Sequence, residues 1–310
     1  MAVILNTVFP LFALILIGFL AARLNLLGAD AVTALNKFVV WMALPALMFQ
    51  AMAQISWEDI NQPGYVAATS LSMALIFGLA YLLDRKRRLA DISLEGLAAS
   101  YSNTGYMGIP LALMVFGDSI LPAVVIAMLL TACGLFAFSI ALIEIDLQGS
   151  GSLWRTAAKV GKSLAINPLV AAPAAGLIVA AFQLPLPSGV YRFTTLLGAA
   201  ASPCALVTIG LFLAHGQATR QHLAVGRIVF LKLILHPLLT FVLVRWVFDM
   251  PPMWANAAIL LSALPVGTGP FMLAALYGRE PAVTSRAILM STVLSVVTVS
   301  VLLGWINSAG

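Results

Sequence analysis

Long apolar stretches recur along the whole chain and constrain its fold more than any other feature. The first runs from Val3 to Ala22, and others follow at short intervals to the C-terminus. A helix that crosses a lipid bilayer needs roughly 20 mostly apolar residues. The chain is 62% hydrophobic and only 9% charged, whereas soluble domains are about 25% charged. We therefore predict an all-α integral membrane protein with little sequence left for a soluble domain.

Ten apolar stretches are separated by polar or turn-forming segments. The chain is accordingly predicted to fold as a first five-helix repeat (1–147), a cytoplasmic linker (148–161) and a second five-helix repeat (162–310). No basic residue precedes the first stretch, which is expected to be retained as a helix and not cleaved as a signal peptide. The expected helices are about Val3–Ala22, Val32–Ala53, Gly64–Leu83, Gly96–Phe116, Ile120–Ile143, Lys162–Phe182, Val190–Ala214, Ala224–Phe248, Trp254–Tyr277 and Thr284–Ile306.

The basic residues gather in the odd-numbered connections and at the helix ends beside them. The positive-inside rule places these connections in the cytoplasm and both termini outside. Five helices in each half then invert the second half relative to the first. Thirteen of the 16 basic residues follow this pattern: Arg23, Lys37, Arg85, Lys86, Arg87, Arg88, Arg155, Lys159, Lys162, Arg220, Arg227, Arg279 and Arg286.

Four pairs of prolines recur at a nearly constant separation of 158 to 160 residues. Prolines also gather near helix ends without any repeat, but the helix order and the charge pattern independently favour an inverted 5+5 repeat. The pairs are Pro10 and Pro168, Pro45 and Pro203, Pro122 and Pro281, and Pro110 and Pro270.

The predicted fourth and ninth helices each contain a Gly/Pro-rich interruption, at Asn103–Pro110 and Leu264–Pro270. Glycine and proline weaken a helix, and unwound backbone inside a membrane survives only against protein or a wet cavity. The alternative is a pair of ordinary proline kinks, but matched interruptions in two halves indicate a transporter binding site. The candidate substrate-binding residues are Asn103, Thr104, Gly105, Tyr106, Gly108, Pro110, Pro265, Gly267, Thr268, Gly269 and Pro270.

The motif Asn103–Pro110 resembles the fourth helix of the auxin efflux carrier family, whose bacterial members are related to the plant PIN-FORMED carriers. The segments Ala43–Ala46 with Gln50, Asn167-Pro168 and Ala201–Ala205 resemble its second, sixth and seventh helices. The resemblance implies a ten-helix inverted repeat in which broken helices 4 and 9 cross at the membrane midplane. It also implies secondary transport of an organic anion such as malonate, malate or an auxin-like carboxylate. Gln50 joins the candidates if helix 2 faces the crossing.

The charged residues are consistent with an anionic substrate. All eleven acidic residues are expected in loops or at helix ends, so no carboxylate at the membrane centre would repel an anion. The half-helices starting near Pro110 and Pro270 would direct their positive N-terminal ends toward it. Lys232 and His236, four residues apart in predicted helix 8, are candidates for steering the anion. Alternatively, Lys232 snorkels to the cytoplasmic interface and His236 is a neutral packing residue.

Other function classes find less support. The sequence has no HExxH run, Gly-x-Ser-x-Gly elbow or clustered metal ligands, and Cys133 and Cys204 have no spacing that suggests a disulfide or metal site. We expect no enzyme activity, cofactor or metal, and the scattered basic residues do not favour nucleic acid. A sodium-coupled symporter of the bile-acid type is the nearer alternative, and the coupling ion is left open. The expected partners are a small organic anion and the bilayer of the bacterial cytoplasmic membrane, with a homodimer left open.

Overall fold

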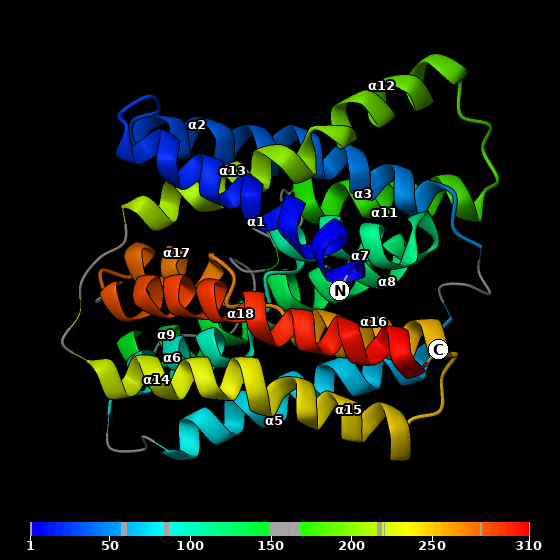
Figure 1. Cartoon of the computed structure of the whole chain (residues 1–310). Helices are drawn as coiled ribbons and strands as arrows, with labels where there is room; N and C mark the ends of the chain where they lie inside the picture. The colour runs from blue at the N-terminus through cyan, green and yellow to red at the C-terminus, as the bar shows by residue number, and fades with distance from the viewer. Residues whose placement is uncertain are drawn as a thin grey trace. The chain divides into compact units, whose positions relative to one another are not determined.

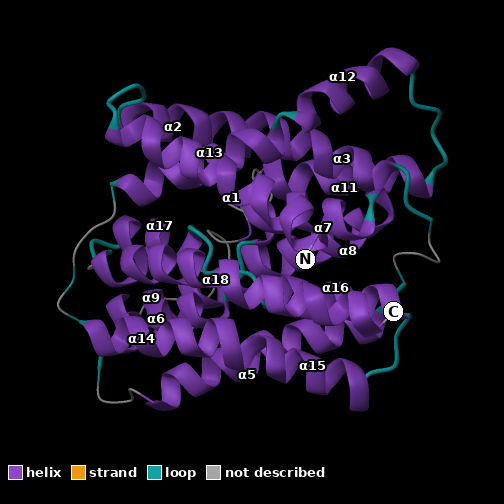
Figure 2. Ribbon diagram, in the orientation of Figure 1, coloured by secondary structure: helices purple, strands orange, loops and turns teal. Residues whose placement is uncertain are grey.

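The computed structural model describes residues 2–56, 61–83, 87–148, 161, 168–215, 219, 221–279 and 281–309. These residues are almost entirely helical, and no strand occurs among them (Figure 2). Six of the helical stretches in this part of the chain are long and apolar enough to cross a membrane: Asp30–Ala53, Pro63–Leu83, Asp118–Leu147, Ser188–Ala214, His222–Trp246 and Ala282–Ile306. The prediction of an all-α membrane protein is therefore confirmed. Most of the predicted linker 148–161 and the residue Asn167 lie outside the described residues.

The α-helices, labelled as in Figure 1, are α1 (Ala2–Arg23), α2 (Ala29–Phe38), α3 (Leu44–Ala53), α5 (Pro63–Leu83), α6 (Leu89–Ser100), α7 (Ile109–Phe116), α8 (Leu121–Leu129), α9 (Phe136–Gln148), α11 (Pro168–Ala181), α12 (Ser188–Ala199), α13 (Ala201–Ala214), α14 (His222–Phe230), α15 (His236–Trp246), α16 (Pro252–Ser262), α17 (Gly269–Leu276) and α18 (Ala282–Ala309). Four short π-helical segments, η1 (Val39–Ala43), η2 (Thr104–Gly108), η4 (Leu130–Leu135) and η5 (Leu231–Leu235), continue into the α-helix that follows each of them. A 3₁₀ turn, η3 (Asp118–Ile120), precedes α8.

Predicted helices 4 and 9 are both interrupted, as the sequence indicated. Helix 4 consists of α6 and α7, and helix 9 consists of α16 and α17. The predicted start of helix 4 at Gly96 is wrong, because α6 begins seven residues earlier at Leu89. The apolar pattern misplaced this boundary because Asp91 and Glu95 lie within α6, and Glu95 is only 5% exposed. The expectation that every carboxylate lies in a loop or at a helix end therefore fails at Glu95.

The described helices group into two compact units, each of which takes helices from both halves of the sequence. Unit 1 consists of Met1–Gln62, Gly105–Leu129 and Leu164–His215. Unit 2 consists of Pro63–Thr104, Leu130–Ser163 and Gly216–Gly310. This division differs from the predicted repeat halves, since unit 1 contains predicted helices 1, 2, 6 and 7 together.

In unit 1, α1 packs along α13, and α3 packs along α11 and α12 (Figure 1). Glycines allow both close approaches. A Cβ atom on Gly18 would lie 2.2 Å from the carbonyl oxygen of Val207, and one on Gly176 would lie 2.5 Å from that of Phe49. Gly176 follows Gly18 by 158 residues, and Val207 follows Phe49 by the same number. The two contacts thus match at the spacing that separates the proline pairs.

In unit 2, α5 packs against α6 and α15, α15 packs against α16, and α6 packs against α9. Apolar side chains from α5, α6, η4, α9 and α17 form one buried cluster, which includes Phe77, Leu97 and Leu273. Removing apolar surface from water gains roughly 25 cal/mol per Å², but removing it from lipid gains no such energy. Inside a membrane, these helices are therefore held together mainly by close packing of the side chains that face one another. α6 and α16, which end at the two breaks, are thus each packed against neighbouring helices of unit 2.

Candidate functional site

The two helix breaks lie together in unit 2 and bond to each other through their backbones. α6 ends at Ser100 and α16 ends at Ser262. Beyond these ends, Ser102 and Val266 form an isolated antiparallel bridge. The N–H of Asn103 donates to the carbonyl oxygen of Pro265 at 2.9 Å, and the N–H of Gly267 donates to that of Tyr101 at 3.1 Å. Each break therefore satisfies polar groups that the other one exposes.

A hydroxyl from a third helix completes this backbone pairing. The N–H of Val266 donates to Oγ of Ser291, in α18, at 3.1 Å. An unpaired backbone group inside a bilayer costs several kcal/mol, so this hydroxyl stabilises the break directly. The sequence did not single out Ser291, because α18 contains several other serines and threonines.

The glycines of the second break make room for an aromatic ring. A Cβ atom on Gly267 would lie 2.8 Å from Cε1 of Tyr101, and one on Gly269 would lie 2.8 Å from its Cζ. Both separations are shorter than Cβ contacts in proteins ever are. Gly267 and Gly269 are therefore required for packing against Tyr101, a residue that no sequence motif had indicated.

Asn103 places a buried amide at the paired breaks. The residue is 6% exposed, and among the described residues its side chain has no hydrogen-bond partner. Its neighbour Thr104 is 3% exposed and shares a hydrogen bond of 3.2 Å with the hydroxyl of Thr131. Thr268 is half-buried in the other break. The amide of Asn103 can donate two hydrogen bonds and accept others, and the described protein atoms do not use this capacity.

Several predicted site residues belong to unit 1 and have local partners there. Gly105 and Gly108 lie in η2, and Pro110 lies in the first turn of α7. The hydroxyl of Tyr106 donates to Oδ1 of Asn36, and Nε2 of Gln50 donates to Oγ1 of Thr195 at 3.0 Å. The other candidate substrate-binding residues lie in unit 2, which brings together Asn103, Thr104, Pro265, Gly267, Thr268, Gly269 and Pro270.

Lys232 lies in η5 and does not reach the membrane surface. The residue is 0% exposed, and its Nζ donates to the carbonyl oxygen of Ser262, the last residue of α16. The same Nζ lies 3.1 Å from Nδ1 of His236, which is 2% exposed. The snorkelling interpretation of Lys232 is therefore wrong. Instead, the amine binds the C-terminal end of α16, at the break in helix 9.

The chain is similar to known proteins over nearly its whole length. A family model described as membrane transport protein matches residues 3–303. The chain belongs to this family. It is 34% identical to a Rhizobium meliloti (strain 1021) protein named "Putative malonate transporter", over 99% of this chain and 97% of that protein.

More distant relatives of this membrane transport protein are similar over most of their length. The Escherichia coli (strain K12) protein "Uncharacterized transporter YfdV" is 26% identical over 83% of this chain and 82% of its own. The Arabidopsis thaliana protein "Auxin efflux carrier component 8" is 22% identical over 95% of each chain. The resemblance to auxin efflux carriers is thereby confirmed, and the chain is a transport protein and not an enzyme.

The membrane transport protein also carries a charged cluster in unit 2. Glu95 of α6 binds Arg87 through Oε1 and Arg227 of α14 through Oε2. Arg279 lies 3.4 Å from Oδ1 of Asp91 and 4.0 Å from Oδ2 of Asp146. Two arginines neutralise the buried carboxylate of Glu95, which explains how α6 tolerates an acidic residue that the apolar pattern placed outside it.

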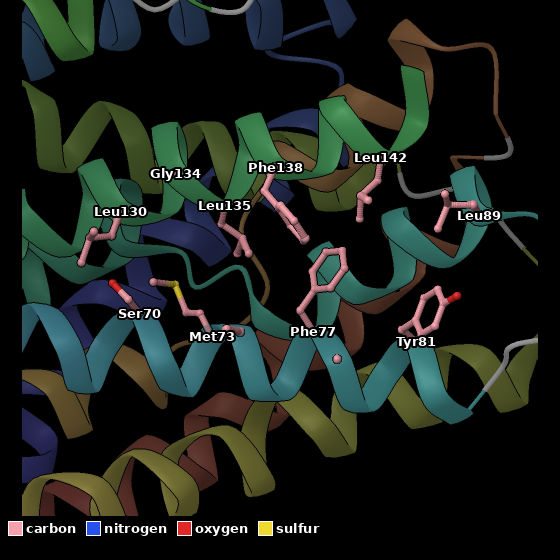
Figure 3. Close-up of a pocket in the computed structure, with 12 residues that line it drawn as sticks. Ser70, Met73, Phe77, Tyr81, Leu89, Leu130, Gly134, Leu135, Phe138 and Leu142 are labelled. Carbon is pink, nitrogen blue, oxygen red and sulfur yellow. The ribbon is translucent and has the colours of Figure 1, made fainter. Parts of the chain in front are cut away.

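An apolar cavity of about 650 Å³ lies between α5 and the segment formed by η4 and α9 (Figure 3). The rings of Phe77 and Phe138 meet edge to face across it, with centroids 5.3 Å apart. Ser70 and Tyr81 contribute the only hydroxyl groups to its lining, which contains no charged or amide side chain. An anion would lose its hydration there without gaining a partner, so the lining of this cavity does not suit an anion.

Proposed function

We propose that this membrane transport protein is a secondary transporter that carries a small organic anion by alternating access. The substrate is a mono- or dicarboxylate such as malonate or malate, or an auxin-like acid. One observation carries the proposal: Asn103, only 6% exposed as a residue, holds an amide without a described hydrogen-bond partner at two paired helix breaks. The similarity to a protein named a putative malonate transporter supports a carboxylate.

The chemistry of the paired breaks suits a carboxylate. The amide nitrogen of Asn103 can donate two hydrogen bonds, and the hydroxyl of Thr268 can donate one. α17 begins at Gly269, directly after the break, and a helix N-terminus favours negative charge. A hydrogen bond to a charged acceptor contributes about 1.5–3 kcal/mol, which corresponds to roughly one to two decades of affinity.

The proposal includes a ten-helix architecture formed by two inverted five-helix repeats, with broken helices 4 and 9 crossing at the membrane midplane. The matched contacts of Gly18 with Val207 and Gly176 with Phe49 support it, since unrelated halves would have no reason to repeat a contact at the same spacing. The basic residues support an inner-membrane protein with both termini outside the cytoplasm.

Binding of malonate and malate to purified protein tests the proposal. A ligand at 100 times its dissociation constant stabilises the folded state by about 2.7 kcal/mol. Asn103→Ala should weaken binding by one to two decades and lower uptake into proteoliposomes, while the protein still inserts and purifies normally. Asn103→Asp keeps the size of the side chain but adds a negative charge, so it should abolish anion binding.

Asn256, half-buried within α16, provides the matched control, and Asn256→Ala should bind malonate as the wild type does. Unchanged binding and transport in well-folded Asn103→Ala protein would contradict the proposed site. Replacing sodium by choline in the uptake assay separates the proposal from the sodium-coupled alternative, which requires transport to stop.

A further inference from the structure

A directed chain of hydrogen bonds begins at Lys232 and links η5, α15 and α5 in unit 2. The hydroxyl of Ser72 in α5 donates to the carbonyl oxygen of Thr69 at 2.9 Å, so its oxygen is available to accept. Nε2 of His236 lies 3.4 Å from that oxygen and therefore carries the ring proton in this contact. Nδ1 is then the unprotonated nitrogen, which accepts from Nζ of Lys232 at 3.1 Å. The imidazole is neutral in this arrangement, and the Lys232 amine is the donor.

The contacts of Lys232 satisfy a neutral amine but leave one proton of an ammonium without an acceptor. A neutral amine has two protons, which suffice for the carbonyl of Ser262 and for His236. An ammonium has a third proton that needs another acceptor. No carboxylate contacts Lys232 within the described parts of the chain, and a buried charge without a counter-ion is costly. The extra proton is therefore favourable only when an anion is near.

The other ionisable groups near Lys232 do not supply that anion. Those in the described portions of α5, α6, α14, α15 and α18, which pack against η5, are Tyr65, Tyr81, Asp91, Glu95, His222, Arg227, His236, Arg245 and Arg286. Glu95 binds Arg87 and Arg227, and Asp91 binds Arg279. Of this group, His236 is the residue that contacts Lys232.

The substrate can supply the anion, because Lys232 and Asn103 bind the same helix break. Lys232 binds Ser262, and the backbone of Asn103 binds Pro265, three residues further along. We propose that Lys232 is the proton site of this transporter: its amine takes one proton from water as the carboxylate binds, and returns it when the carboxylate leaves. The inference rests on the proposed function and adds that one proton travels with each anion.

Proton uptake during binding tests this inference directly. Malonate is titrated calorimetrically into the full-length protein at pH 7.5, in buffers that differ in ionisation enthalpy. The wild type should take up one proton per malonate. Above pH 7.5, the affinity of the wild type for malonate should fall by about tenfold per pH unit, because the complex holds a proton that the free protein lacks.

Two variants separate proton binding from positive charge alone. Lys232→Arg introduces a guanidinium that is protonated at all times, so this variant should bind malonate without proton uptake. Lys232→Met removes the charge and should lose most of the affinity. Malonate binding to wild-type protein without proton uptake would overturn this inference and leave the proposed function standing. Unchanged proton uptake on malonate binding to Lys232→Met would do the same. If neither malonate nor malate binds the wild type, the proposed function falls and the inference falls with it.

Discussion

Adding one methyl group at Gly18 should separate α1 from α13. The Cβ atom of Gly18→Ala would lie 2.2 Å from the carbonyl oxygen of Val207, and ordinary contacts begin near 3.4 Å. A backbone carbonyl cannot rotate aside, so the helices must move apart by about 1 Å. Such overpacking costs about 1–3 kcal/mol, against about 1 kcal/mol gained when alanine replaces glycine in a helix. Because the atoms of Val207 that the new methyl group would meet all belong to the backbone, the upper part of this range applies, leaving a net loss of about 2 kcal/mol.

The matched contact gives the experiment its internal test. Gly176→Ala would place its Cβ atom 2.5 Å from the carbonyl oxygen of Phe49, so its loss of stability should be similar to that of Gly18→Ala. Gly226 is an exposed glycine within α14 with open space around it. Gly226→Ala should therefore gain up to about 1 kcal/mol from helix propensity alone.

Thermal unfolding in detergent, followed by the fluorescence of the six tryptophans, measures all three variants. The melting temperature should fall for Gly18→Ala and Gly176→Ala and should not fall for Gly226→Ala. A Gly18→Ala protein that melts with the wild type would refute the close approach of α1 and α13. A loss at Gly18 without one at Gly176 would refute the equivalence of the two contacts.

Two other predictions concern topology and the paired breaks. In a cysteine-free background, Arg88→Cys and Ser308→Cys should react with an impermeant thiol reagent from opposite sides of the membrane, and labelling from one side would contradict the assigned orientation. Gly267→Ala should lower the melting temperature because its Cβ atom meets the ring of Tyr101, and adding Tyr101→Ala should reduce that effect in a double-mutant cycle. Additive losses would show that the ring is not the cause.

The sequence predicted the location of both helix breaks because glycine and proline act locally on the backbone. It also indicated the family, since the motif Asn103–Pro110 is continuous in the chain. The pairing of Ser102 with Val266 joins residues 164 positions apart. Such a contact has no local signature, so sequence reasoning could place the two breaks at related positions without showing which atoms bond.

Side-chain direction explains the two main errors. Lys232 lies close to the predicted start of helix 8, and its side chain is long enough to reach the membrane interface. In the structure, however, its Nζ donates to the carbonyl oxygen of Ser262. Glu95 was excluded from helix 4 because a lone carboxylate is unfavourable in an apolar segment. Its partners Arg87 and Arg227 come from separate segments, and this compensation becomes visible only in three dimensions.

The hydrogen bonds between the two breaks limit how this protein can move. Pulling the break after α6 away from the break after α16 would leave the N–H of Asn103 and Gly267 and the carbonyls of Pro265 and Tyr101 without partners. With several kcal/mol lost for each such group in a bilayer, that separation is too costly to occur in every cycle. Under the proposed alternating access, we expect the two breaks to move together, and the gates that open the pathway to either side to hinge elsewhere in the chain.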